Sequence, residues 1–258
     1  MNKIIRSTLL MVWLPALLVV VWWVATASST NLYIPPLETI LRAFVRDWFG
    51  PNLISDGLPS IAKFAAGFLI ASVTGIVLGL LIGLSPTLSA ALDPLIQFFR
   101  AIPPPALLPV ALLVVGIGPG MSIAVIAIGA VWPTLLNTID GVRAVDPQVR
   151  DMAASYRLPL GTRIVKVVLP AASPQIFAGL RVSLQLSIIL IVVAEMFAST
   201  SGIGFYVLYS QQTFGIPETW AGTLVLGLLG YLATLLFVLV ERRVLGWHRG
   251  MTDSLEKA

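Results

Sequence analysis

The sequence predicts an all-α membrane protein with six transmembrane helices, and three observations lead to this fold class. The chain is 57% hydrophobic and 11% charged, whereas soluble domains carry about 25% charged residues. Six apolar segments are long enough to cross a bilayer as helices, which takes about 20 residues. The longest polar interruption, residues 140–170, carries five Lys or Arg residues, as cytoplasmic loops do.

The composition excludes several kinds of site. The chain has no Cys and a single histidine, His248, so we expect no disulfide, metal centre or heme. It contains no G-x-x-x-x-G-K-[ST] motif, so any ATP must be bound by another chain. No basic stretch is interleaved with aromatic residues, which argues against nucleic acid as a partner. We therefore expect no catalytic residue and no cofactor in this chain.

Residues 1–58 predict a transmembrane anchor followed by an external amphipathic helix. Residues 8–27 are apolar and form the first span. A retained anchor is favoured over a cleaved signal peptide, although residues 25–27 resemble a cleavage site. Residues 37–48 carry apolar and charged faces at helical spacing, so this helix either lies in the outer interface or packs against the bundle.

The second span, residues 59–84, carries small residues at every fourth position. This spacing puts them on one helix face and lets a neighbouring backbone approach closely. The predicted packing seam consists of Gly67, Ala71, Gly75, Gly79 and Gly83.

The third span is predicted to begin at Asp93, an N-cap residue followed by a proline. It contains Arg100 and is then broken by three prolines, Pro103, Pro104 and Pro105. Broken backbone at membrane depth is tolerated only beside protein or a water-filled cavity, so this span is expected to line a pathway. The alternative is a kink without a role. Residues 121–139 form the fourth span.

The polar loop predicts two short helices with a bend between them. Asp146 caps the first helix and Pro159 ends it. The second helix runs over residues 161–168 and ends at Leu169-Pro170, and the fifth span starts at Ser173. The loop should therefore project from the membrane.

Glu195 stands inside the fifth span, near its outer end. A carboxylate in hydrocarbon costs a few kcal/mol, so it must face the bundle, a cavity or a partner, or else extend to the interface. A flexible loop at residues 200–204 follows, and residues 220–240 form the sixth span, which stops at Glu241.

Lys and Arg are distributed unevenly between the two sides of the predicted membrane. Of sixteen, two lie before the first span, five in the polar loop and four after the sixth span. Only Arg42 and Arg46 lie in outer segments. This positive-inside pattern places both termini and the loop in the cytoplasm.

The loop resembles the E-A-A---G---------I--L-P signature of permease subunits of binding-protein-dependent ABC importers. Asp151, Met152 and Ala153 stand at E-A-A, Arg157 at the glycine, and Leu169-Pro170 at L-P. The stretches RAIPPPALLP, LPAASPQIFAGLR and AEM resemble the nitrate, sulfonate, taurine and bicarbonate branch. The resemblance covers about residues 59–240.

The resemblance implies a type I importer (MetI-like) permease core over residues 59–245, with coupling helices in loop 140–170 and a cytoplasmic tail at 246–258. It implies a multi-pass protein of the bacterial plasma membrane, in contact with membrane lipid and a second permease copy. An ATPase dimer would bind the ATP-Mg, and a periplasmic or lipid-anchored binding protein would deliver the cargo. The implied coupling residues are Asp151, Met152, Ala153, Tyr156, Arg157, Pro159, Leu169 and Pro170. The implied pathway and gating residues are Arg100, Pro103, Pro104, Pro105, Glu195, Gly202 and Gly204.

The implied cargo is a small anion of the sulfonate, taurine or nitrate type. The alternative is a neutral or aromatic cargo, such as a pyrimidine vitamin precursor, and a membrane channel or enzyme is disfavoured. Arg100 and Arg181 are the cations near the spans that would attract an anion, unless they anchor phosphates or cap carbonyls at the cytoplasmic end.

Two residues of the loop depart from the family pattern. Asp151 is one methylene shorter than the usual Glu, which reduces its reach to an ATPase arginine. Arg157 replaces the Gly that allows the turn between the helices, so Pro159 is predicted to supply the break instead.

Overall fold

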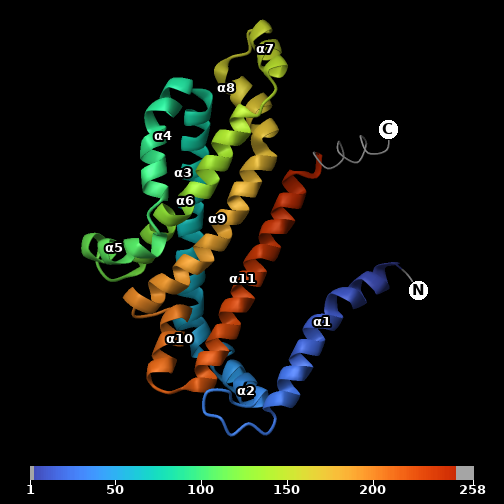
Figure 1. Cartoon of the computed structure of the whole chain (residues 1–258), viewed down its shortest axis with the longest axis vertical. Coiled ribbons are helices and arrows are strands. Elements are labelled where there is room, and N and C mark those ends of the chain that lie inside the picture. Colours follow the sequence, from blue (N-terminus) through green and yellow to red (C-terminus); the bar gives the residue numbers. More distant parts are fainter. Residues whose placement is uncertain (1–2, 248–258) are drawn as a thin grey trace.

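A computed structural model describes residues 3–247, whose regular elements are all helices, with no strand among them (Figure 1). Three long helices form the core of the bundle: α3 (Leu58–Leu84), α6 (Pro119–Arg143) and α9 (Leu169–Ala198). Helix α6 packs between α3 and α9, and α11 (Ile216–Val244) packs against α9. The predicted tail lies outside the described residues from His248 onward.

Four helices in the described part of the chain are long and apolar enough to cross a membrane. A fifth span results if the bent pair Pro86–Arg100 and Pro104–Val115 crosses as one unit. In α1 (Lys3–Thr26), the apolar stretch Trp13–Thr26 is shorter than this length. The all-α membrane fold is confirmed, and the first of the six predicted spans stays a prediction.

Helix α1 contacts the rest of the molecule near its C-terminal end, next to α2 (Leu37–Trp48) (Figure 1). The rings of Trp22 and Trp220 lie 5.7 Å apart there. Leu37, Ile40 and Trp48 of α2 are buried, and this face packs on α11. Of the two alternatives for this helix, the structure shows packing against the bundle.

The predicted seam on α3 faces α6. A Cβ added at Gly75 would lie 2.9 Å from the Cβ of Thr134, and one at Gly79 would lie 2.5 Å from the Cβ of Thr138. Added Cβ atoms at Gly67 and Gly83 would meet Ile126 and Val142 in the same way. The missing side chains let the two backbones approach closely. Van der Waals contact can then hold the helices together in a bilayer, where the hydrophobic effect does not drive helices to associate.

The predicted start of the third span at Asp93 is wrong. Helix α4 (Pro86–Arg100) begins after Ser85, whose hydroxyl accepts a hydrogen bond from the backbone N–H of Leu88 at 3.3 Å. Ser85-Pro86 is a capping pair of the same kind and comes first in the chain, so the helix runs on through Pro94. Arg100 therefore lies about 21 Å from the start of the helix, farther than a start at Asp93 would place it.

The predicted break at the proline run is confirmed. After Arg100 the chain forms a short 3₁₀ turn, Pro104–Leu107, and then α5 (Leu108–Val115). The bend between the two parts of this span is 85°. Gly116 and Gly118, both with positive φ, then turn the chain into α6.

The predicted end of the second loop helix at Leu169-Pro170 is wrong, as is the predicted start of the fifth span at Ser173. Helix α8 (Leu160–Arg163) continues through a π-helical turn (Ile164–Val168) into α9 without interruption. The backbone N–H of Leu169 bonds to the carbonyl of Ile164, five residues back. This wider turn gives room for the ring of Pro170, which would otherwise clash with the preceding turn.

A π-helical turn also precedes α3. A π-helical turn, Leu53–Gly57, precedes Leu58-Pro59, and the N–H of Leu58 bonds to the carbonyl of Leu53. In both places the sequence Leu-Pro follows the π turn. At these two places the wide turn makes room for the proline ring within a continuous helix.

One helix was missed and one end was placed too early. Helix α10 (Ile203–Gln212) starts directly after Gly202, inside the predicted loop 200–204. Helix α11 continues beyond Glu241 to Val244. Helix α10 is too short and too mixed in polarity to show as a span.

The seam between α3 and α6 predicts a strong effect of one methyl group. We expect Gly79→Ala to lower the free energy of unfolding by about 1–3 kcal/mol, because the close helix contact leaves no space for it. Denaturant titration of the purified protein in detergent measures this change. Gly227→Ala is the control, since nothing lies within 4 Å of an added Cβ there. Equal stability of both variants would contradict a tight seam.

Candidate functional site

The polar loop folds into a projecting turn at one end of the bundle, residues 146–163, which we call the knuckle (Figure 1). Its first helix, α7 (Pro147–Ser155), begins after Asp146, whose carboxylate accepts a hydrogen bond from the N–H of Gln148 at 2.8 Å. The predicted N-cap is confirmed. The cap orders a helix of nine residues that would be marginal alone.

Arg157 itself makes the turn that was assigned to Pro159. Its φ is +51°, the left-handed region that favours glycine. The N–H of Leu158 donates to the carbonyl of Ala153 at 3.2 Å, and the N–H of Arg157 donates to that of Ala154 at 2.9 Å. These two bonds form a Schellman motif and satisfy carbonyls at the end of α7. Pro159 instead precedes α8 in an extended conformation.

The knuckle presents apolar side chains to its surroundings. Met152 of α7 and Tyr156, the C-cap residue that follows this helix, lie one turn apart on the same face and are 54% and 76% exposed. Ala153 points the other way and is buried. The assignment of these exposed side chains to a contact with an ATPase stays a prediction. Six predicted coupling residues lie on the knuckle (Asp151, Met152, Ala153, Tyr156, Arg157 and Pro159), whereas Leu169 and Pro170 lie in the first turn of α9.

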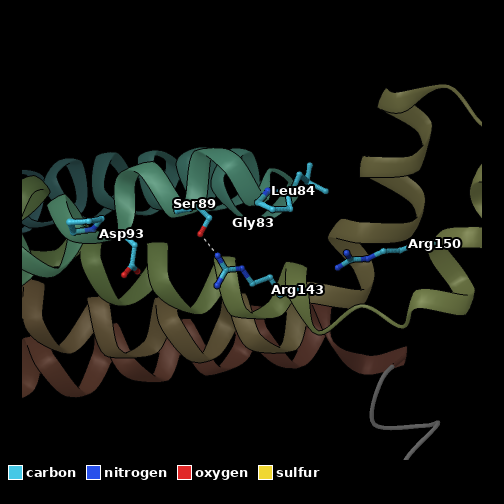
Figure 2. A pocket seen from close by; sticks show the side chains of 9 residues that line it. Gly83, Leu84, Ser89, Asp93, Arg143 and Arg150 are labelled. Carbon is cyan, nitrogen blue, oxygen red and sulfur yellow. Dashed lines mark hydrogen bonds between the residues drawn. The ribbon is translucent and has the colours of Figure 1, made fainter.

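One arginine connects the knuckle to the bundle, and a second connects two bundle helices beside it. Arg150 of α7 donates a hydrogen bond to the carbonyl of Val142 near the end of α6. Arg143, in the last turn of α6, donates to the hydroxyl of Ser89 on α4. Both side chains line a cavity of about 720 Å³ beside the α3–α4 turn (Figure 2).

The broken span packs its proline turn against the core. A Cβ added at Gly129 of α6 would lie 2.9 Å from the Cβ of Pro104, so α6 leaves room for the turn. An apolar pocket of about 410 Å³ lies between α5 and the end of α9, with Pro105, Leu112 and Phe197 in its wall. Arg100, just before the break, is exposed. The assignment of these residues to a pathway stays a prediction.

Glu195 forms a buried ion pair with Lys63 of α3. The distance from Nζ to Oε1 is 2.6 Å, and both side chains are at most 5% exposed. The Ser60 hydroxyl donates to the same oxygen at 2.6 Å, and the N–H of Gly204 donates to Oε2 at 3.0 Å. The pair thus provides the counter-charge and hydrogen bonds that a carboxylate needs in an apolar bundle.

The same network holds the loop between α9 and α10. Lys63 donates to the carbonyl of Ser201 at 3.1 Å, and Asp56 accepts from the N–H of Gly202 at 2.7 Å. Gly202 has φ +127°, and a Cβ there would lie 2.3 Å from the carboxyl carbon of Glu195. Only glycine fits this position, because both the backbone angle and the space exclude a side chain.

The network explains how Glu195 is accommodated. The predicted surroundings of this carboxylate were the bundle, a cavity, a partner or the interface, and it faces the bundle. Lys63 and Ser60 were not assigned to the site. The available signal was Lys63 itself, a lysine in an apolar span with a serine three residues earlier. Arg181 is similarly compensated, since it donates to Glu241 at 2.5 Å.

A polar cluster connects α2, α10 and α11 at the end of the bundle opposite the knuckle. Arg46 contacts Asp47 and Glu218 at 2.7 Å each, and the hydroxyl of Tyr206 donates to Asp47 at 2.6 Å. The hydrogen bond from Arg46 lowers the pKa of Asp47 below its usual value. Among the described residues, no group of three His, Cys, Asp or Glu could hold a metal ion.

The Lys63–Glu195 pair predicts a double-mutant effect. Glu195→Gln leaves the Lys63 ammonium buried without a counter-charge, so we expect a loss of about 3–5 kcal/mol in the free energy of unfolding. Lys63→Met should cost a similar amount, and the double variant should recover most of it, because the Gln oxygen can accept from the N–H of Gly204 while its amide N–H donates to the Ser60 oxygen. Denaturant titration in detergent compares the variants.

Glu38→Gln is the control for this cycle, since Glu38 and Arg42 form an exposed pair (side chains 61% and 79% exposed) whose loss should leave stability unchanged. Purely additive effects of the two buried substitutions would contradict the coupling.

The left-handed turn predicts that glycine is better than the native residue. Arg157→Gly should slow amide hydrogen exchange over residues 153–158 by about fivefold, because it removes about 1 kcal/mol of backbone strain. Arg157→Ala keeps the strain and should show no such gain. Equal exchange rates in the two variants would show that the charge, rather than the backbone, controls this turn.

The chain matches the family model described as "Binding-protein-dependent transport system inner membrane component" over residues 75–246. It is 33% identical to the putative aliphatic sulfonates transport permease protein SsuC of Bacillus subtilis, over 91% of this chain and 86% of the relative. It is 36% identical to the nitrate import permease protein NrtB of Leptolyngbya laminosa, over 86% and 82%.

A solved structure of the MetNI methionine ABC transporter, in an inward-facing conformation, has the same fold. The TM-score is 0.61 at 19% identity, and the match covers 80% of this chain and 98% of that one. The fold and the two sequence relatives agree with the resemblance seen in the loop. The chain therefore belongs to the binding-protein-dependent transport system inner membrane component family.

Proposed function

We propose that this permease carries a small oxyanion across the bacterial plasma membrane, with a separate ATPase supplying the energy. The knuckle carries the proposal: α7 exposes Met152 and Tyr156 at the far end of a bundle whose helices continue into the membrane spans. A short helix with an apolar face suits a groove on a partner protein. In this arrangement the ATPase groove receives α7, and ATP-Mg stays with the partner.

Membership in the inner membrane component family fits a transport subunit with no catalytic role of its own. The proposed partners follow from this membership. A second copy of the permease completes the pathway, and an external binding protein delivers the cargo to the end that carries α10. The knuckle and both termini then lie in the cytoplasm, in accord with the positive-inside distribution of Lys and Arg.

The cargo assignment rests on the relatives' names and on one cation. The two relatives described above are named for sulfonates and nitrate, which are oxyanions. Arg181 is neutralised by Glu241, whereas Arg100 is exposed and makes no salt bridge with any residue from 13 to 247. Arg100 also stands beside the proline break, where irregular backbone favours a water-filled path. We therefore assign the contact with the anion to Arg100. No observation in the described residues favours a neutral cargo.

Glu195, Gly202 and Gly204 are proposed to act in gating through the network with Lys63. Because this network holds the α9–α10 loop against α3, opening the outer end of the path requires α3 and α9 to move together with the loop. The proline turn of residues 103–105 then borders the path at mid-depth.

Docking on the knuckle predicts a loss of ATPase binding. We expect Met152→Ser combined with Tyr156→Ser to weaken copurification of the ATPase subunit at least about tenfold, because the apolar anchors of the interface are removed. Membrane insertion should be unchanged. Tyr209→Ser is the control, since Tyr209 is an exposed tyrosine at the other end of the bundle. Full recovery of the ATPase with the double variant would contradict docking on α7.

A transport assay tests the cargo. Vesicles that contain the permease, the ATPase and the binding protein should take up a sulfonate or nitrate, and Arg100→Gln should reduce this uptake with little effect on ATPase copurification. Uptake of a pyrimidine precursor without any oxyanion uptake would overturn the cargo assignment and leave the knuckle proposal intact.

A further inference from the structure

A cavity of about 720 Å³ lies where three elements meet near the knuckle (Figure 2). The α3–α4 turn forms one wall, and the end of α6 and the first turn of α7 form the other. Its volume lies within the range of small-molecule sites. The lining residues that bear on its chemistry are Ser89, Asp93, Arg143 and Arg150.

The lining is basic, with unused hydrogen-bond donors. Arg143 donates to Ser89, and Arg150 donates to the carbonyl of Val142. Each guanidinium has five N–H donors, so these bonds leave most of them available. The Nε of Arg150 is buried and has no partner. Asp93 is the acidic residue of the lining, so the two arginines outweigh it.

We propose that this cavity binds a tetrahedral oxyanion, a phosphate or sulfate group. Guanidinium groups match the oxygens of such anions in geometry and charge, and they keep their own charge at any physiological pH. Arg143 and Arg150 hold the anion from the wall formed by α6 and α7, and the hydroxyl of Ser89 on α4 completes the site. The group comes either from a lipid headgroup or from a free anion.

An anion in this cavity connects the knuckle to the bundle. It contacts α7 through Arg150, α6 through Arg143 and α4 through Ser89, all of which lie around one space (Figure 2). Arg150 is three residues before buried Ala153, on the inner side of α7, whereas Met152 and Tyr156 face outward. The anion therefore stiffens the base of the knuckle without covering its exposed face. This proposal concerns the chain alone and does not depend on the cargo.

The test uses the full-length chain in a neutral detergent. Its thermal stability is followed as sodium sulfate replaces sodium chloride at constant ionic strength. We expect a saturable stabilisation by sulfate, and Arg143→Gln should raise the half-saturating sulfate concentration at least about tenfold, because a charge-assisted contact is lost. Asp93→Asn should lower that concentration by about threefold, because it removes the one acidic group of the lining.

Arg242→Gln is the matched control: Arg242 is exposed near the end of α11 and does not line the cavity, so its sulfate response should equal that of the wild type. If Arg143→Gln destabilises the fold, the lower half-saturating sulfate concentration expected for Asp93→Asn still tests the proposal.

A second arm distinguishes the source of the anion. The same variants are placed in nanodiscs of phosphatidylcholine with or without phosphatidylglycerol, and bound lipids are counted by native mass spectrometry. Retention of phosphatidylglycerol that depends on Arg143, without a sulfate effect, assigns the site to a headgroup. A sulfate effect without lipid retention assigns it to a free anion. Absence of both effects, or equal losses in Arg143→Gln and Arg242→Gln, overturns the proposal.

Discussion

The close approach of α6 to its two neighbours is the constraint on which the rest of the bundle depends. Glycines of α3 face α6 on one side, and on the other side a Cβ added at Gly179 of α9 would lie 2.7 Å from the carbonyl oxygen of Pro133. At the centre, Thr134 and Ser183 share a hydrogen bond of 2.8 Å, and Ser183 donates to the carbonyl of Ala130. Packing and internal hydrogen bonds thus do what the hydrophobic effect cannot do in a bilayer.

This three-helix unit links the two ends of the molecule. The helix that begins at Leu160 in the knuckle continues to Ala198, three residues beyond Glu195. Under the proposed coupling, this one continuous element would carry a displacement of the knuckle to the Lys63–Glu195 pair, where α3 joins it. The π turn at residues 164–168 is the place along this helix where the backbone departs from regular α geometry. Since such turns rotate the residues that follow, it sets how the knuckle is oriented relative to the spans.

Features with a local cause could be predicted from the sequence, whereas features that depend on partners far along the chain could not. The glycine stripe, the proline break and the cap at Asp146 each follow from a few adjacent residues. The pairing of Lys63 with Glu195 joins residues on different helices, and no spacing rule connects them. Two predicted helix ends are wrong because another local effect is stronger. Ser85 caps α4 earlier in the chain than the predicted cap, Asp93. A π turn accommodates Pro170, where the predicted helix ends.

The left-handed turns show how the fold imposes a conformation that its sequence does not favour. Arg157 and Phe214 are the non-glycine residues with positive φ in residues 3–247. Each follows a short helix at one end of the bundle, and each sits in a Schellman motif; after α10, Gly215 donates to the carbonyl of Ser210 and Phe214 to that of Gln211. An L-residue costs about 1 kcal/mol or more in this conformation, so the paired hydrogen bonds and the anchored helix that follows must hold it there. Both turns direct the chain back into a long helix, α8–α9 after Arg157 and α11 after Phe214. The strain is thus located at the two ends, where partners of the permease are proposed to dock, and not in the glycine-packed core.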